Sequence, residues 1–191
     1  MSALAGPAPA RPIRRLQIGC GPCAVPGWIN ADRRPGPGVD LCADLRDGLP
    51  LPDACIDYAV AMHVLQDLPW PALPGVLAEL RRVLVPGGTL RLGLPDLDRA
   101  IDAYRHGDPT YFHVPDRDAA SIGAKLVTQL IWYGSVRTPF CFGFAHELLE
   151  RAGFRAVRRC DYGRSASPHA AIAALDNRPR ESLFVEAEAP S

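Results

Sequence analysis

An apolar run that opens into two glycines, followed closely by an acid, constrains this chain more than any other feature. Residues 16–18 are Leu-Gln-Ile, the glycines are Gly19 and Gly21, and Asp32 ends a second short apolar run. A strand that opens into a glycine turn lets backbone N–H groups approach a ligand closely, and an acid at the tip of the next strand can accept hydrogen bonds from a ribose. This order of residues predicts a nucleoside-binding α/β domain.

The composition is typical of one globular domain and argues against several classes of function. Of the 191 residues, 48% are hydrophobic and 22% are charged, which is enough apolar material for a proper core. The 21 basic and 21 acidic residues balance, so no net field draws the chain to nucleic acid or to an anionic membrane. No apolar run approaches the ~20 residues that cross a bilayer. We therefore expect neither nucleic acid nor a membrane as a partner.

The first twelve residues lack the basic start and the apolar stretch of a signal peptide. We expect them to form a flexible tail before a single domain over residues 13–191, in a cytoplasmic protein whose six cysteines are mostly reduced. The histidines and cysteines show no metal-ligand spacing beyond the pair Cys20 and Cys23, so no metal site is expected. The pattern leaves the oligomeric state open, a homodimer included.

Short strand-like runs alternate with turns and helix-like segments along the chain. The expected strands span residues 13–18, 28–31, 39–43, 56–61, 89–94, 156–161 and 182–188. The clearest helix lies over residues 71–84, where leucines and valines recur on one face at helical spacing. This alternation predicts a three-layer α/β fold with an open, mostly parallel, Rossmann-like sheet.

The alternation lapses between residues 105 and 140. Polar, aromatic and histidine residues there precede a helix expected over residues 119–133. Open α/β sheets bind ligands at the carboxyl ends of their strands, so we interpret this segment as a helical insertion or lid over that edge. A second long connection, residues 162–181, joins the last two expected strands.

Two further acids bear on the nucleoside interpretation. Asp44 is expected at the end of the third strand, where its carboxylate can accept the exocyclic amine of adenine while the N–H of Leu45 meets a ring nitrogen. Asp57 opens the fourth strand, and we expect it in a structural turn at the opposite end of the sheet.

Several short motifs follow one another in a fixed order. They are Gly-Cys-Gly-Pro at 19–22, Pro-Gly-Trp at 26–28, Asn-Ala-Asp at 30–32, Ala-Asp-Leu at 43–45, Ile-Asp at 56–57, His-Val-Leu at 63–65 and Leu-Val-Pro-Gly-Gly at 84–88. With them the chain resembles the class I S-adenosylmethionine-dependent methyltransferases, and most of all a small bacterial type 11-like group. Each match is ordinary, but their order and spacing are specific, and the similarity covers nearly all of the chain after Arg15.

The resemblance implies a seven-stranded sheet with an antiparallel last strand and S-adenosylmethionine bound over strands one to four. The site residues that it implies are Gly19, Cys20 and Gly21 beside the methionine part, Asp32 on the ribose hydroxyls, Asp44 with Leu45 on adenine, and Met62 and His63 near the sulfonium. The implied activity is methyl transfer, which we expect to act on a small-molecule or saccharide-like acceptor. His63 and Asp67 are the catalytic candidates, because a hydroxyl or amine acceptor needs a base.

The chain departs from this group at three places. Gln17 stands where many of these enzymes carry an acid, so the ammonium of the methyl donor needs another partner or a water. Gln66 and Asp67 replace a Glu-His pair, which leaves the acceptor chemistry open. The connection over residues 20–27 is short for a crossover between parallel strands, and we expect a single helical turn there.

Other interpretations stay open at this stage. A domain that binds S-adenosylmethionine without methyl transfer could serve as an interaction module or support other chemistry. Cys20 and Cys23 reproduce the Cys-Gly-Pro-Cys motif of thioredoxins and could form a disulfide, although Pro26 ends any helix that would lower a thiol pKa. The glycines also fit a dinucleotide pattern, for which Asp32 comes too early. His63 could instead be a packed residue, and Arg178 either an acceptor clamp or the partner of Asp176.

Overall fold

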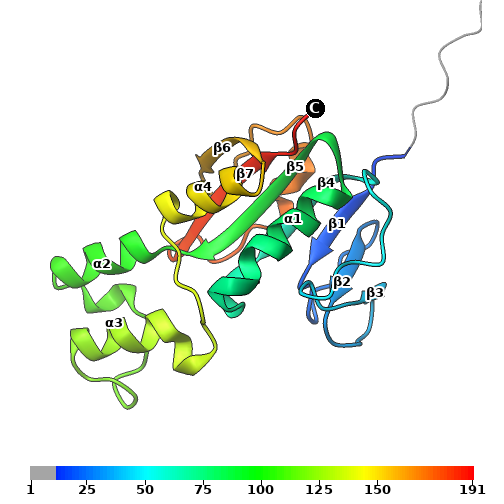
Figure 1. Ribbon diagram of the computed structural model, residues 1–191. Coiled ribbons are helices and arrows are strands. Elements are labelled where there is room, and N and C mark those ends of the chain that lie inside the picture. Colours follow the sequence, from blue (N-terminus) through cyan, green and yellow to red (C-terminus); the bar gives the residue numbers. More distant parts are fainter. Residues whose placement is uncertain (1–11) are drawn as a thin grey trace, which may run out of the picture.

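The computed structural model describes residues 12–191, which form a seven-stranded sheet with surrounding helices (Figure 1). The strands are β1 (Arg15–Ile18), β2 (Ile29–Asp32), β3 (Leu41–Cys42), β4 (Ile56–Met62), β5 (Leu84–Pro95), β6 (Arg155–Cys160) and β7 (Ser182–Glu188). Their spatial order is β3-β2-β1-β4-β5-β7-β6, and β7 runs antiparallel to both of its neighbours while the other pairs are parallel. The predicted Rossmann-like sheet with an antiparallel last strand is confirmed.

The helical elements include the two helices expected over residues 71–84 and 119–133, with different bounds, and two further helices. They are α1 (Leu73–Val83), α2 (Leu97–Arg105), α3 (Ile122–Ile131) and α4 (Phe142–Arg151), with short 3₁₀ turns η1 (Leu65–Asp67), η2 (Trp70–Ala72), η3 (Pro109–Tyr111), η4 (Trp132–Gly134) and η5 (Ala170–Leu175). The helix expected over 71–84 is η2 followed by α1. The flexible tail was expected over residues 1–12. All of it except residue 12 lies outside the described residues.

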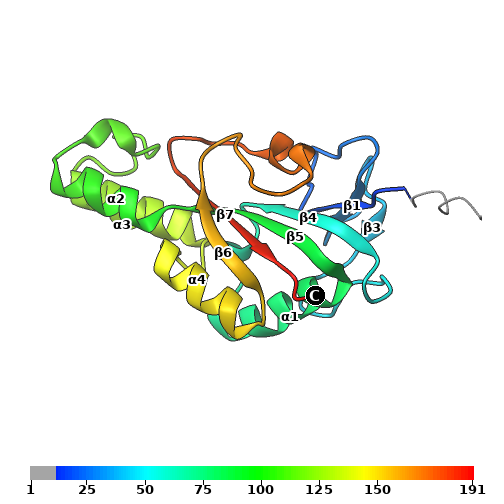
Figure 2. The ribbon, with the colours of Figure 1, turned by 90° about the horizontal axis from the view of Figure 1, so that it is seen from above.

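One face of the sheet is covered by α1 and α4 (Figure 2). The predicted apolar stripe of α1 is buried there: its leucines and valines at 73, 76, 77, 80 and 83 are at most 1% exposed. They meet the alternate residues of β4 and β5 that point to the same side, such as Ala59, Leu90 and Leu92. The helix ends at Val83 because Leu84 already has extended backbone (ψ 139°) and begins β5, which runs on through residues 86–88.

The other face of the sheet has no crossover helix from the β1–β2 connection. The helical turn expected over residues 20–27 is wrong: the segment forms a hydrogen-bonded turn, in which the Cys23 N–H donates to the Cys20 carbonyl (2.9 Å), and then runs on without helix. Its length explains this, because a helix and two turns need more residues. Instead, Trp28 packs edge-on against Tyr58, and Ile172 of η5 closes over the same cluster.

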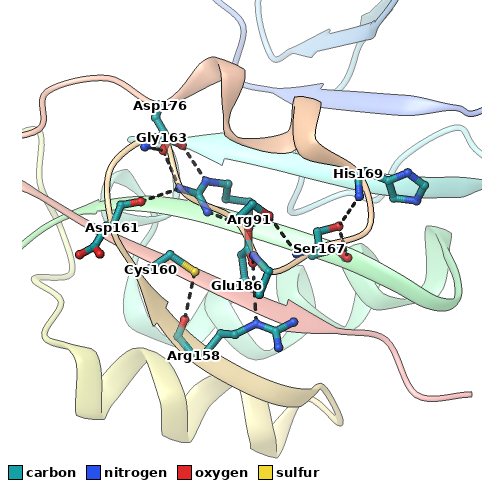
Figure 3. A network of polar contacts seen from close by, with 12 residues as sticks. Arg91, Arg158, Cys160, Asp161, Gly163, Ser167, His169, Asp176 and Glu186 are labelled. Atoms are coloured by element: carbon teal, nitrogen blue, oxygen red, sulfur yellow. Dashed lines mark hydrogen bonds and ion pairs between the residues drawn. The ribbon is translucent and has the colours of Figure 1, made fainter.

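The long β6–β7 connection, residues 162–181, therefore acts as the cover of this face (Figure 2). It is held by a buried ion-pair network around Arg91 of β5 (Figure 3). The guanidinium of Arg91 is fully buried, contacts Asp176 with both Nε and Nη2 (2.7 and 2.5 Å), and contacts Glu186 of β7 with Nη1 (2.7 Å). Ser165 also donates to Glu186, so the network ties both ends of the connection to the sheet.

The helices α2 and α3 pack against each other and project beyond the carboxyl edge of the sheet (Figure 1). Asp96 caps α2 by accepting hydrogen bonds from the N–H groups of Asp98 and Arg99. The sequence analysis assigned no helix to residues 97–105, although this aspartate before an apolar and charged run is an N-cap signal. We call residues 97–134 the α2–α3 lobe.

We expect Arg91→Leu to lower the free energy of unfolding by about 3–5 kcal/mol, because it leaves buried Asp176 without its counter-charge and buried Glu186 with the more distant Arg158 alone. Urea denaturation measures this loss. The matched control is Arg151→Leu, which breaks the exposed pair with Glu147 (2.5 Å) and should change stability by at most ~1 kcal/mol. Equal effects of the two substitutions would contradict a structural role for the network.

Candidate active site

Two cavities open side by side at the carboxyl ends of the central strands. The first, of about 340 Å³, lies over β1, β2 and the β3–β4 connection, and is lined by Gly19, Asp32 and Asp44 among others. The second, of about 250 Å³, lies between β5 and the α2–α3 lobe. His63 and Asp67, the two catalytic candidates, line both cavities. The loop after β4 is thus where the two cavities meet.

The glycine turn after β1 forms one end of the first cavity. Gly19 has a φ of +66°, and a Cβ at this position would stand 2.4 Å from a methyl carbon of Val64, so only glycine fits. Gly21, also at positive φ (+51°), donates its N–H to the Asp32 carboxylate (2.9 Å). The turn therefore brings backbone to the cavity, and its N–H groups at residues 19, 20 and 21 donate to the Ala31 carbonyl and the Asp32 carboxylate.

Asp32 stands at the tip of β2 and lines the first cavity. One carboxylate oxygen accepts from the N–H of Gly21 and the other from the N–H of Arg34, both at 2.9 Å. These bonds fix the carboxylate, and each oxygen keeps a lone pair. The side chain is thus preorganised to accept hydrogen bonds from a pair of hydroxyls.

Asp44 lines the same cavity but already has a partner. Arg46 contacts both of its oxygens (2.9 and 2.6 Å), and these hydrogen bonds hold the pKa of the Asp44 carboxyl low, at about 2. Leu45 and Leu49 provide an apolar wall beside it. An adenine bound at Asp44 must share the carboxylate with Arg46 or displace this guanidinium.

His63 follows β4 in the left-handed backbone region (φ +55°). Its Nε2 lies 2.8 Å from the hydroxyl oxygen of Ser182, whose only proton reaches the Asn177 carbonyl (3.2 Å). The ring therefore donates from Nε2, which leaves Nδ1 with the lone pair. Burial, with the nearby charge of Arg178, lowers the pKa of His63 to about 4, so the imidazole is neutral at pH 7.

Gln66 and Asp67 lie beside His63 on the 3₁₀ turn η1. The Gln66 amide nitrogen donates to Asp67 (3.2 Å), while the Gln66 side-chain oxygen has no hydrogen-bond partner among the described residues. Burial raises the pKa of the Asp67 carboxyl. The Gln66 side-chain oxygen and the Asp67 carboxylate therefore make this part of the site rich in hydrogen-bond acceptors.

Cys20 and Met62, which the resemblance placed at the donor, lie beside the first cavity rather than among the residues that line it. Met62 packs against Gly93 and the Trp28 cluster. Burial and the charge of Asp32 raise the pKa of the Cys20 thiol, whereas a redox-active cysteine needs a lowered pKa. The six cysteines are free thiols, and the thioredoxin interpretation loses its chemical basis.

The sequence analysis missed several residues of the site. Arg137 lines the first cavity and Trp132 the second, but both come from the irregular segment before α4, which carries no motif. Arg178 lines the second cavity, while Asp176, its expected alternative partner, is taken by Arg91. Ser182 could be found only from the fold, because it lies 119 residues from His63.

The described residues offer neither a cluster of metal ligands nor a membrane-spanning helix. Within residues 12–191, no three His, Cys, Asp or Glu side chains gather as a metal ion would require. In the same part of the chain, no helix is both long and apolar enough to cross a bilayer.

Comparison with known proteins agrees with this geometry. The family described as "Methyltransferase domain" matches residues 20–92, the span that holds β2, β3 and β4. The chain is 40% identical over 83 residues, 44% of its length, to an uncharacterised 37.1 kDa protein of a Streptomyces fradiae transposon, of which it spans about a fifth (21%).

Solved structures of S-adenosylmethionine-dependent methyltransferases share the fold. One from Thermotoga maritima aligns with a TM-score of 0.57 at 18% identity and covers 94% of this chain and 84% of its own. One from Mesorhizobium loti aligns with a TM-score of 0.55 at 19% identity, covering 92% and 90%. By the family match over residues 20–92 and by this shared fold, the chain is similar to class I S-adenosylmethionine-dependent methyltransferases.

We expect the stability of the protein to fall by about 2 kcal/mol between pH 7 and pH 5 because of His63 alone. Its pKa is about 4 in the folded state and 6.5 when unperturbed, so the unfolded chain binds more protons in that interval, and stability is lost as the pH falls. Urea denaturation at the two pH values measures the loss, and His63→Gln should remove about this part of it. The same loss in His63→Gln as in the parent would refute the lowered pKa. His106→Gln, on the exposed end of α2, is the control.

Proposed function

We propose that this protein is a methyltransferase. It would move the methyl group of S-adenosylmethionine to an acceptor held in the second cavity, a small molecule or a saccharide-like molecule. The observation that carries the proposal is that two cavities meet at His63 and Asp67. A transfer reaction needs two ligands in contact at one point and shielded from water, and binding them side by side supplies much of the rate. One cavity alone would fit a binding module equally well.

The residues of the first cavity fit the donor. Gly19 lines this cavity and carries no side chain, so a ligand can contact backbone there. The fixed carboxylate of Asp32 suits ribose hydroxyls, and the wall of Leu45 and Leu49 suits an adenine ring. When bound, S-adenosylmethionine supplies a methyl group on a sulfonium: the methyl–sulfur bond breaks with its electron pair left on sulfur, and the acceptor's lone pair forms the new bond.

The chain's own part in the reaction is positioning and proton removal. His63 is neutral at pH 7 and anchored by Ser182, so it can orient an acceptor N–H or O–H without moving. Asp67, with a carboxyl pKa raised by burial, can take the proton that the acceptor loses. Arg178 lies on the same wall, 3.5 Å from the carboxylate of Glu181.

We expect Asp32→Ala to weaken S-adenosylmethionine binding by ~1.5–3 kcal/mol, because a charged hydrogen-bond acceptor is lost. Asp32→Asn, which keeps the shape, should show a smaller loss. Calorimetry measures both, and Asp102→Ala, on an exposed turn of α2 outside both cavities, is the control with unchanged affinity. Equal affinity of Asp32→Ala and the parent protein would remove the first cavity as the donor site.

Product analysis separates methyl transfer from binding alone. The parent protein, given S-adenosylmethionine and an extract of small molecules, should form S-adenosylhomocysteine and a product heavier by one methyl group. His63→Gln and Asp67→Asn, at residues that line both cavities, should slow this reaction far more than they weaken donor binding. Tight donor binding without turnover in any extract would favour the alternative, a donor-binding module.

A further inference from the structure

The second cavity carries an unmet hydrogen-bonding requirement at Gln66. The residue is 5% exposed, and its side-chain oxygen is shut from solvent with no donor in contact among the described residues. The orientation of the amide is fixed, because only its NH₂ end can donate to the Asp67 carboxylate. The backbone of Gln66 is held as well: its carbonyl accepts from the N–H groups of Arg137 and Thr138 at 2.8 and 3.0 Å.

The carboxylates on the wall of this cavity differ in whether a basic side chain forms an ion pair with them. Asp96 is paired with Arg159 and Arg99, whose side chains lie outside the cavity. Glu181 lies 3.5 Å from Arg178, the guanidinium on the wall. Asp67 has no basic side chain within ion-pair distance in the described part of the chain, and Gln66 is its side-chain hydrogen-bond partner. Burial raises the pKa of the Asp67 carboxyl, while the charges of Arg33 and Arg178, which act from beyond ion-pair distance, lower it. A carboxylate without a contacting counter-charge thus lies next to the unsatisfied amide oxygen.

Much of the remaining wall is apolar. Leu97, Ala100, Leu130, Val136, Pro139 and Phe140 line the cavity, together with the polar side chains of Gln129 and Ser135. A ligand that matches both the apolar part of the wall and the Gln66–Asp67 pair has a compact apolar body. It also carries one positively charged group with several N–H donors. A carboxylate or phosphate in the same place would face two acceptors and a negative charge.

We propose that Gln66 and Asp67 form the specificity-determining pair of the acceptor site and select an amine on a small apolar or aromatic body. This inference rests on the proposed function and names its substrate class. The neutral imidazole of His63 lies on the same wall and fits this class, because an amine that has lost its proton needs no stronger base to attack a methyl group.

Three probes of nearly equal shape test the proposal: benzylamine, benzyl alcohol and benzoate, each titrated into the protein saturated with S-adenosylhomocysteine. The donor product fills the first cavity, so the probes report on the second. We expect benzylamine to bind at least ~10-fold more tightly than benzoate at pH 7, with benzyl alcohol between them. NMR titration measures these affinities. If benzoate binds as tightly as benzylamine or more tightly, the proposal is wrong.

Substitutions assign the preference to the pair. Gln66→Leu and Asp67→Asn should each weaken the binding of benzylamine by ~10-fold. Gln66→Glu should strengthen the binding of benzylamine and leave the affinity for benzyl alcohol nearly unchanged. Gln129→Leu is the matched control: Gln129 lines the same cavity, but its oxygen already accepts from the His113 N–H (2.7 Å), so the amine preference should stay. An unchanged benzylamine affinity in both Gln66→Glu and Asp67→Asn would overturn the assignment.

The outcomes separate this inference from the proposed function. Each variant is first titrated with S-adenosylhomocysteine, which reports folding and an intact first cavity. If the parent protein does not bind the donor product, the proposed function fails. If it binds the donor product but shows no preference for the amine, only the inference on Gln66 and Asp67 fails.

Discussion

The buried contact of Arg91 with Asp176 and Glu186 is the interaction on which the rest of the structure depends. It is found on the sheet face that has no crossover helix between β1 and β2, so the β6–β7 connection has to cover that face. An ion pair removed from water stabilises a fold only if its geometry is good and its remaining hydrogen bonds are made. Both conditions hold here, because the Asp161 carbonyl, the Gly163 N–H and the Ser165 hydroxyl complete the network.

This network also positions the reaction site. Asp176 is followed directly by Asn177 and Arg178, and Ser182 begins the next strand. Asn177 accepts the hydroxyl proton of Ser182, which in turn holds His63 at the junction of the two cavities. A buried cluster on β5 is thus connected through one short segment to the side chain nearest the proposed chemistry. The left-handed backbone of both His63 and Arg178 fits this view, because strained residues persist where the surrounding structure fixes them.

The two cavities differ in the kind of recognition they offer. The first uses backbone and a fixed carboxylate, which suits a ligand whose sugar and base vary little. The second is built partly from the α2–α3 lobe and has an apolar wall with a polar end at Gln66 and Asp67. A lobe that projects from the sheet can change its part of the lining without disturbing the core. The departure at residues 66–67 from the Glu-His pair of the related group lies at this polar end.

The sequence by itself determined the features whose signals are local. These are the glycine turn, the acid that ends β2, the acid shortly after β3, the apolar stripe of α1 and the alternation of strands and helices. Each occupies a short window, and backbone geometry and burial give it a recognisable pattern. The tertiary structure decided what depends on distant partners. Arg91 meets carboxylates 85 and 95 residues away, and His63 meets Ser182 119 residues away. No periodicity records such pairs, since their proximity exists only after the sheet has set the order of its strands. For the same reason the sequence showed that the β1–β2 connection is short. It did not show that the β6–β7 connection covers the sheet face left without a crossover helix.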